Sequence, residues 1–403
     1  MKLLPAPWRE RPGLRPLLAA LEAAEGQTRF VGGCVRDTLL GISVSDVDLA
    51  TRLQPEEVMT RLKRARIRVV PTGIAHGTVT AVLSDGPVEV TTLRRDVSTD
   101  GRRATIAYTE DWREDASRRD FTINALSADP ETGEIFDYFG GEADLEARRL
   151  RFIGDPLTRI AEDHLRILRF FRFHARFGQG EPDAAALGAC IARANDLMAL
   201  SRERIADELL KLLALPDPAS TVALMVDRGI FAPVLPEFGA DGVVRLVELI
   251  RREQAADEAP EPVRRLAALL PPDPSAAAAV AARLRLSKKV AKRLVSAAAR
   301  ADEQAADPKE LAYRLGMEGA IDRLLLGDDS AAAKVALLRS WPIPRLPLTG
   351  GELIKLGLSP GPLVAATLQA IERDWIAAGF PPEEDRLREL AAARVEKALS
   401  GNG

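Results

Sequence analysis

The pattern of apolar and polar positions changes about a third of the way along the chain. The early part contains three runs rich in valine and threonine and punctuated by glycine, which is typical of β-strands. After a hairpin-like stretch at 134–145, nearly every apolar segment has helical spacing. The pattern therefore predicts an α+β protein, in which a small mixed-sheet domain ends near residues 140–150 and an all-helical remainder follows. The strand-like runs are residues 67–72, 76–83 and 87–94, and helices are expected at 14–24 and 55–66.

One short unit, residues 29–51, combines a glycine pair with two spaced carboxylates. Gly32 and Gly33 interrupt an apolar, β-prone run ahead of a short predicted helix, whose first backbone N–H groups have no partner within the helix. The run SVSDVDLA then predicts a strand on which Asp46 and Asp48 project from the same face. A glycine pair alone usually marks a tight turn, and Asp-x-Asp alone is more often a solvated strand end. Their combination in one unit favours a phosphate and metal site.

A third carboxylate is available in the run at 87–94. Glu89 alternates with Val88 and Val90, so its side chain faces away from the apolar ones. If this strand neighbours the strand that carries Asp48, Glu89 reaches the same site. Grouped carboxylates suit a hard divalent cation, because such ions prefer oxygen ligands.

The next segment is less regular. Residues 98–115 lose periodicity and become strongly charged, which predicts a loop. In RRDFTINALSAD, Asp120 or Thr122 is predicted to cap a helix that begins near Ile123. The arginine pair before Asp120 would then stand at the entrance of this helix, although such a pair can equally be solvated.

An arginine-rich helix is predicted over residues 157–178. Its apolar residues share one arc and its arginines share another. Asp163 lies one turn before Arg166, on the edge of the basic side. The local charge between Arg148 and Arg176 is about +5. A solvated face is the ordinary interpretation, but arginine without lysine suits bidentate recognition of a polyanion. The apolar arc holds Ile167, Leu168, Phe170 and Phe171, and the basic arc holds Arg166, Arg169, Arg172 and Arg176.

Composition sets further bounds. The 403 residues allow two to four domains, and a net charge of −3 means that nucleic acid would have to bind through local basic patches. Residues 283–300 are a second such patch, for which phosphate contact and a solvated face are about equally good interpretations. Cys34 and Cys190 fit no metal spacing and are expected to be buried thiols in a reducing compartment. With no signal-peptide pattern and no apolar run of membrane length, we expect a cytoplasmic protein without membrane contact.

Taken together, the motifs identify a family resemblance. GGCVRD with LLG and DVD, then HGTV, VEVTTLR, RRDFTINAL and EDHLRILRFFRFHARFG, in this order and spacing, resemble the class II CCA-adding tRNA nucleotidyltransferases and bacterial poly(A) polymerases, within the polymerase β-like nucleotidyltransferases. The motifs cover about residues 29–178 and are jointly specific; the helical remainder is similar to the body and tail of the CCA-adding members. The resemblance implies a catalytic head at 1–145, a nucleotide-selecting neck at 146–215, a body at 216–300 and a tRNA-contacting tail at 301–403.

The resemblance also implies residue roles. Asp46 and Asp48 would hold magnesium, and Glu89 would be the third catalytic acid. CTP and ATP would be the substrates and the tRNA 3′ end the partner, with no obligate protein partner. Cys34 stands where alanine is usual and Leu93 where an aromatic is expected, but neither departure touches a charged role. The implied nucleotide-binding residues are Gly33, Arg36 and Arg119 at the triphosphate, and Asp163, Arg166, Arg169 and Arg172 in the neck.

Elementary chemistry agrees with this reading. Two metal ions held by carboxylates can activate a 3′-hydroxyl and neutralise a triphosphate, so no histidine base is needed. The histidines, at 76, 164 and 174, are not followed by aspartate, so an HD-type phosphohydrolase site is not supported. Asp163 accepts and Arg166 donates, which matches the amine and ring nitrogen that cytosine and adenine share.

Three alternatives stay open at this stage. A poly(A) polymerase shares the fold, although GIAHGTV is closer to the CCA-adding branch. A catalytically silent RNA-binding relative would not need all three acids. A small-molecule nucleotidyltransferase would share the head but would not need the long helical remainder.

Overall fold

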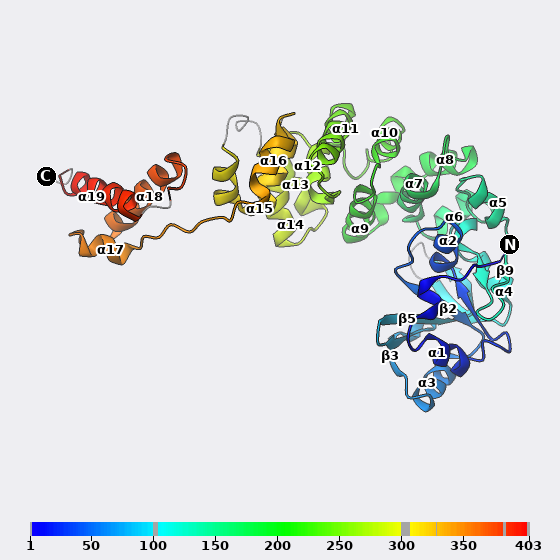
Figure 1. Ribbon diagram of the computed structural model, residues 1–403. Coiled ribbons are helices and arrows are strands. Elements are labelled where there is room, and N and C mark those ends of the chain that lie inside the picture. Colours follow the sequence, from blue (N-terminus) through cyan, green and yellow to red (C-terminus); the bar gives the residue numbers. More distant parts are fainter. Residues whose placement is uncertain (1, 100–103, 300–306, 328, 382–383, 401–403) are drawn as a thin grey trace. The chain divides into compact units, whose positions relative to one another are not determined.

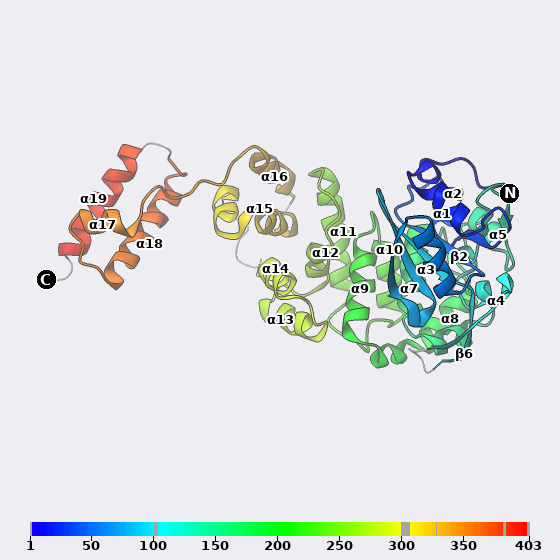
Figure 2. The same ribbon diagram turned by 90° about the horizontal axis from the view of Figure 1, so that it is seen from below.

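The computed structural model describes residues 2–99, 104–299, 307–327, 329–381 and 384–400. The chain forms two compact units (Figures 1 and 2). The first runs up to Val243 and includes Arg283–Leu286, and the second comprises Val244–Ala282 and the chain from Ser287 onward. The four-part division at residues 145, 215 and 300 stays a prediction.

A mixed seven-stranded sheet forms the centre of the first unit, with the strand order β3-β4-β5-β2-β1-β8-β9 (Figure 1). The central neighbours β2 and β5 are parallel, and the other described pairs of this sheet are antiparallel. Helices alone follow the last described strand, so the predicted α+β class is confirmed. The strands are β1 (Thr28–Val31), β2 (Val47–Thr51), β3 (Arg68–Gly73), β4 (Thr78–Leu83), β5 (Gly86–Thr92), β8 (Ser127–Ala128) and β9 (Ile135–Phe136).

Short helices surround this sheet, and longer ones follow it. α3 packs against β3 and β4, while α2 contacts β1 and β2. The helices before residue 150 are η1 (Pro7–Glu10), α1 (Leu14–Ala20), α2 (Gly33–Leu39), α3 (Pro55–Arg64), η2 (Ile74–His76), α4 (Trp112–Ser117), η3 (Thr122–Asn124) and α5 (Gly141–Glu146). Those that follow in the first unit are α6 (Pro156–Glu162), α7 (Arg166–Phe177), α8 (Ala184–Ala192), η4 (Ala194–Ala199), α9 (Arg202–Leu213) and α10 (Ala219–Asp227).

Strand alternation fixes the orientation of the central carboxylates. On β2, Val47 and Leu49 are buried, while Asp48 between them faces the other side of the sheet. On β5, Val88 and Val90 are buried, and Glu89 is exposed. The predicted alternation is therefore confirmed for Asp48 and Glu89, whereas Asp46 lies just before β2 begins.

The predicted loop at 98–115 is wrong for the residues that the structure describes. β6 (Arg94–Thr99) and β7 (Ala104–Tyr108) form an antiparallel hairpin, and α4 follows it. Asp111 caps α4 by accepting the Arg113 N–H at 2.8 Å. A two-stranded ribbon outside the main sheet needs no continuous apolar face, so its charged sequence resembles a loop. Residues 100–103 of the predicted loop lie outside the described residues.

The helix predicted to begin near Ile123 is also wrong. The chain makes only the single 3₁₀ turn η3 before β8 pairs with β1. Neither Asp120 nor Thr122 caps a helix there, because Phe121 occupies the N-cap position. Asp120 instead accepts the Phe121 N–H at 2.8 Å, and Thr122 donates to Asp144 at 2.6 Å.

A break divides the helix that was predicted over 157–178. Asp163 has extended backbone angles, φ −152° and ψ 106°, between α6 and α7. Its carboxylate accepts the Leu165 N–H at 3.1 Å, a local turn that competes with the helix. The sequence pattern predicted that Asp163 and Arg166 lie on one continuous helix. This prediction is wrong. The apolar arc of α7 is confirmed, since Ile167, Leu168 and the two phenylalanines that follow are buried.

The regular secondary structure of the second unit is helical in all its described elements. α15 is interrupted at Gly316, where φ is +77°, a conformation that glycine adopts without strain. No described helix combines the length and the apolar character needed to cross a membrane. The helices, of which α11 and α13 extend into the first unit at one end, are α11 (Ala240–Ala255), α12 (Pro262–Leu269), α13 (Pro274–Arg283), α14 (Lys288–Ala298), α15 (Pro308–Gly327), α16 (Ala331–Arg339), α17 (Gly350–Lys355), α18 (Pro362–Ala377) and α19 (Glu384–Ser400).

Candidate active site

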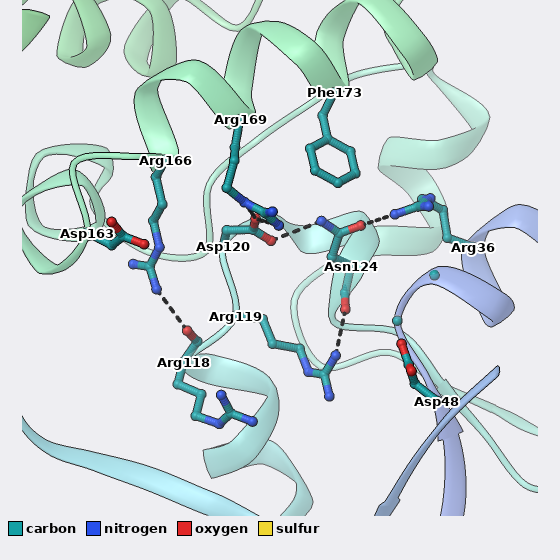
Figure 3. A pocket seen from close by; sticks show the side chains of 12 residues that line it. Arg36, Asp48, Arg118, Arg119, Asp120, Asn124, Asp163, Arg166, Arg169 and Phe173 are labelled. Atoms are coloured by element: carbon teal, nitrogen blue, oxygen red, sulfur yellow. Dashed lines mark hydrogen bonds and ion pairs between the residues drawn. The ribbon is translucent and has the colours of Figure 1, made fainter. Parts of the chain in front are cut away.

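An arginine-lined cavity of about 400 Å³ lies in the first unit, where η3 and the segment before it meet α2, β2 and α7 (Figure 3). Seven of the ten residues proposed from the sequence line it, which brings residues more than a hundred positions apart into one site. These seven are Gly33, Arg36, Asp48, Arg119, Asp163, Arg166 and Arg169, and the other lining residues are Gly32, Arg118, Asp120, Asn124 and Phe173.

The other three predicted residues, Asp46, Glu89 and Arg172, are not among the residues that line the cavity. Asp46 immediately precedes β2, and its carboxylate accepts a hydrogen bond from Ser45 at 2.8 Å. Glu89 lies opposite Asp48 in the parallel register of β2 and β5. Arg172 donates through Nε to Glu208 on α9 at 2.6 Å.

The carboxylates at β2 and β5 form a region of excess negative charge. Burial and the neighbouring charge of Glu89 raise the pKa of Asp48 to about 6. The positive charge of Arg119 opposes this rise, and Asp46 adds to it. Oxygen donors under mutual repulsion fit a hard divalent cation, which would relieve the repulsion. Within the described residues, however, no three such acidic, histidine or cysteine side chains are gathered closely enough to hold a metal ion. The expected convergence of three carboxylates on a metal ion therefore stays a prediction.

The glycine pair allows the chain to pass close to the arginines. Gly32 has φ +68°, and a Cβ added there would lie 3.0 Å from Arg119 Nη1 and 3.6 Å from the Asn124 carbonyl oxygen. A side chain at this position would therefore be strained and crowded. No side chain caps α2 after Gly32, and both glycines face the cavity.

Arg36 and Arg119 are each held in place by hydrogen bonds to neighbouring oxygen acceptors. Arg36 is buried and donates through Nε to Asp37 at 2.7 Å, and its guanidinium lies over the Phe177 ring at 4.3 Å. Arg119 donates to the Asn124 carbonyl and to Asp115, both at 3.4 Å. Two guanidinium groups fixed beside a glycine turn suit a polyphosphate, because their donors match phosphate oxygens.

Arg166 and Asp163 both line the cavity, but each has a different protein partner. Arg166 donates to Glu162 at 2.5 Å, to the Arg159 carbonyl at 2.8 Å and to the Arg118 carbonyl at 3.1 Å. Asp163 pairs instead with Arg204 of α9 at 2.7 Å. Both side chains are therefore oriented by the protein, although not by each other.

Sequence reasoning gave no site role to several residues that the structure brings to the cavity. Asp120 accepts from Arg169 at 2.8 and 2.5 Å, and Phe173 lies beneath the Arg169 guanidinium at 5.2 Å. Asn124 is hydrogen-bonded to Asp120. The signal for Asp120 and Asn124 was the RRDFTIN segment itself, in which these two polar residues lie four apart around an apolar pair. Arg204, the partner of Asp163, carried no local signal.

Comparisons with known proteins agree with this geometry. A model of the poly A polymerase head domain matches residues 28–151, and a model of the probable RNA and SrmB-binding site of polymerase A matches residues 182–241. The mitochondrial CCA tRNA nucleotidyltransferase 1 of Mus musculus is 34% identical over 391 residues, which cover 93% of this chain and 88% of that protein. The CCA-adding enzyme of Limosilactobacillus fermentum is 33% identical over 378 residues, or 90% of this chain and 92% of that protein.

Solved structures give the same result. The Bacillus stearothermophilus CCA-adding enzyme in complex with CTP has a TM-score of 0.75 at 26% identity, over 98% of this chain and all of that chain. The Thermotoga maritima CCA-adding enzyme complexed with tRNA_CCA shares the fold, with a TM-score of 0.69 at 21% identity over 96% of each chain.

The fold and the cavity, together with these relatives, define a nucleotidyltransferase. The chain belongs to the family of CCA-adding tRNA nucleotidyltransferases. The similarity extends through the helical remainder, which argues against the small-molecule nucleotidyltransferase alternative.

Proposed function

We propose that this protein adds or repairs the 3′-terminal CCA of tRNA from CTP and ATP, without a nucleic-acid template. The observation that carries the proposal is that one cavity joins the acid Asp48 to the arginines Arg36 and Arg119 and to the acceptor and donor side chains of Asp163 and Arg166. Relatives and solved neighbours named as CCA-adding enzymes, among them complexes with CTP, ATP and tRNA_CCA, support it.

Asp46 and Asp48 are the residues that would hold magnesium, with Glu89 as the third catalytic acid. The raised pKa of Asp48 supports this assignment, since it reports crowded negative charge. A bound divalent ion supplies activation of the primer hydroxyl and neutralisation of the phosphate charge. The register that puts Asp48 opposite Glu89 on adjacent parallel strands supports this assignment.

Gly33, Arg36 and Arg119 would bind the triphosphate. The turn at the glycine pair lets phosphate oxygens approach backbone, and the two arginines supply planar donors. Because Arg36 is already fixed by Asp37, little side-chain freedom is lost when it contacts a phosphate.

Asp163 and Arg166 would choose the base. Aspartate accepts from the exocyclic amine of cytosine or adenine, and arginine donates to the adjacent ring nitrogen. Guanine and uracil present the opposite order, which would leave buried polar groups opposed. Arg166 must share its hydrogen bonds with Glu162 and the Arg118 carbonyl to do so. Arg169, which lines the cavity, and Arg172, which does not, would complete the proposed base-selecting pocket, and their pairing with Asp120 and Glu208 keeps them in place.

The finer assignments are part of the same proposal. The head, neck, body and tail would span 1–145, 146–215, 216–300 and 301–403, with tRNA contacted by the tail. We also propose a cytoplasmic location and no obligate protein partner.

One incubation tests the activity. Purified protein is given tRNA that lacks its CCA end, with CTP, ATP or both, and the products are sized to one nucleotide. We expect two additions with CTP alone and three with both. Long tails from ATP alone would indicate the poly(A) polymerase alternative. Binding of tRNA without any addition would indicate the catalytically silent relative, and either result would overturn the proposal.

A further inference from the structure

One buried amide lies between the arginines proposed for the triphosphate and the neck helix α7. Asn124, the last residue of η3, is 8% exposed. Its side-chain carbonyl accepts a hydrogen bond from Arg36, and its amide nitrogen donates to Asp120 at 2.9 Å (Figure 3). Its backbone carbonyl accepts from Arg119 at 3.4 Å. A single residue thus contacts both of these arginines and the acid next to them.

The link continues from Asp120 into the neck. Arg169 of α7 donates to Asp120 through Nε at 2.8 Å and through Nη2 at 2.5 Å. Burial raises the pKa of Asp120, but the charge of Arg169 and the Asn124 hydrogen bond outweigh it, so the pKa lies below its ordinary value. Asp120 is therefore a carboxylate at neutral pH. In the hydrogen-bonded series Arg36–Asn124–Asp120–Arg169, every donor meets an acceptor.

This position calls for a side chain that both donates and accepts, as an amide does. A guanidinium group only donates and a carboxylate only accepts, so a side chain that bridges Arg36 and Asp120 must do both at once. Aspartate at position 124 would keep the acceptor but place a negative charge against Asp120. Alanine would leave one buried donor and one buried acceptor without their partner.

The turn that carries Asn124 is rigidly anchored. Thr122, two residues earlier, donates to the fully buried Asp144 at 2.6 Å, and Arg149 and Arg151 pair with the same carboxylate. The η3 backbone is therefore fixed, so a displaced Arg36 acts on the Asn124 amide group rather than on the whole turn, while Arg119 contacts the backbone carbonyl of the same residue.

We propose that Asn124 is a positioning residue that couples triphosphate binding to base selection, by joining Arg36 and Arg119 to Asp120 and through it to Arg169. This inference rests on the proposed function, which assigns the two ends of the chain to phosphate and base. The inference predicts that Arg36 and Arg169 do not contribute independently to nucleotide affinity while the Asn124 amide is present.

A double-mutant cycle measures this coupling. Equilibrium binding of CTP is determined for Arg36→Ala, Arg169→Ala and the double variant, first with Asn124 and then in the Asn124→Ala background. With Asn124 present, we expect the combined loss of affinity to differ from the product of the single losses by about threefold or more. In the Asn124→Ala background the two losses should multiply. Multiplicative losses in both backgrounds would overturn the proposal.

Matched variants separate positioning from folding. Asn124→Asp keeps the size and the acceptor, and Asn195→Asp makes the same change at an exposed position of η4. We expect folded Asn124→Asp, in which the added buried charge also lowers Tm, to raise KM for CTP and ATP and to narrow the preference for them over GTP and UTP. Asn195→Asp should alter neither KM nor this preference. If Asn124→Ala unfolds, the cycle is run in the Asn124→Asp protein with the same criterion.

Different results would refute the role of Asn124 and the proposed function. CTP binding is measured without turnover, so coupling is read even if the wild type adds no nucleotide to tRNA. An Asn124→Asp enzyme with wild-type KM and selectivity would refute the positioning role while leaving CCA addition intact.

Discussion

Both compact units bury charged side chains, and in the first unit several of them line a described cavity. In the second unit, Glu253 is 1% exposed and accepts from Arg264 and Arg265, both at 2.8 Å. Asp322, also 1% exposed, pairs with Arg264 at 3.5 Å and with Arg293 at 2.6 Å. In the first unit, five arginines but only three aspartates are among the described residues that line the cavity. Buried charge alone therefore does not mark a functional site; accessible volume and unbalanced charge do.

The largest expected effect is at the acids of the first unit. Asp46→Ala or Asp48→Ala should lower the rate of nucleotide incorporation by about a thousandfold or more, because each removes a proposed metal ligand. Single-turnover incorporation in magnesium is the measurement. Asp207→Ala, which breaks an exposed pair with Lys211, is the matched control and should leave the rate unchanged. If either site variant keeps more than about a tenth of the wild-type rate, the assignment of that residue is wrong.

A mutation in the buried charge network of the second unit, formed by Glu253 with Arg264 and Arg265, should change the stability of the protein and not its rate. Glu253→Gln removes the charge of a buried carboxylate that Arg264 and Arg265 share, and should lower the free energy of unfolding by about 3–5 kcal/mol. The rate per folded molecule at low temperature should stay at the wild-type value. Urea unfolding together with an active-site titration tests both parts. A folded Glu253→Gln protein with a lowered rate of nucleotide incorporation would refute the distinction between this buried network and the charges that line the cavity.

The cavity arginines should differ from one another. Arg166→Ala should lose discrimination of cytosine and adenine from guanine and uracil by about a hundredfold, together with rate. Arg36→Ala should lose rate for every nucleotide alike, since we assign it to the phosphates. Single-nucleotide incorporation with all four triphosphates separates the two. An Arg166→Ala enzyme that is as selective as the wild type would refute selection of the base by this side chain.

The smallest effect is expected on the surface of the second unit. Arg283 and Arg285, which belong to the first unit, pair with Glu237 and Glu203, so we assign tRNA contact to the exposed Lys288, Lys289 and Lys292 of α14. Binding of tRNA should weaken steeply with salt, and each Lys→Ala change should reduce the slope of log affinity against log salt by about 0.9.

Lys211→Ala serves as a charge-matched control for these lysines, because Lys211 is bound to Asp207. Salt-independent tRNA affinity, or an equal loss of slope in the control, would exclude α14 as the phosphate contact. Filter binding at several salt concentrations distinguishes these results.

Regular periodicity explains what the sequence could predict. Alternation on β2 and β5 was enough to orient Asp48 and Glu89, and the apolar arc of α7 was evident from its spacing. These features depend on local geometry, and each turns its apolar residues toward one core. The motif resemblance then supplied seven of the residues that line the cavity.

The remaining features depend on contacts that spacing cannot reveal. The hairpin of β6 and β7 was missed because its charged sequence shows no regular alternation of apolar and polar residues. The break at Asp163 was missed because an aspartate turn leaves the helical period on either side unchanged. Arg204 and Glu208 reach the neck arginines and Asp163 from α9, about 40 residues further along the chain, so their pairing could not be inferred from the sequence.

The two buried cysteines have a practical consequence. Both lie in the first unit, and burial raises the pKa of the Cys34 thiol to about 12 and shifts that of Cys190 in the same direction. Alkylating reagents attack the thiolate, so neither cysteine should react in the folded protein. The rate of thiol alkylation therefore records each opening of the first unit, and the second unit, which contains no cysteine, does not contribute to the signal. The alkylation rate of the two native cysteines can therefore be used to measure the stability of the first unit alone.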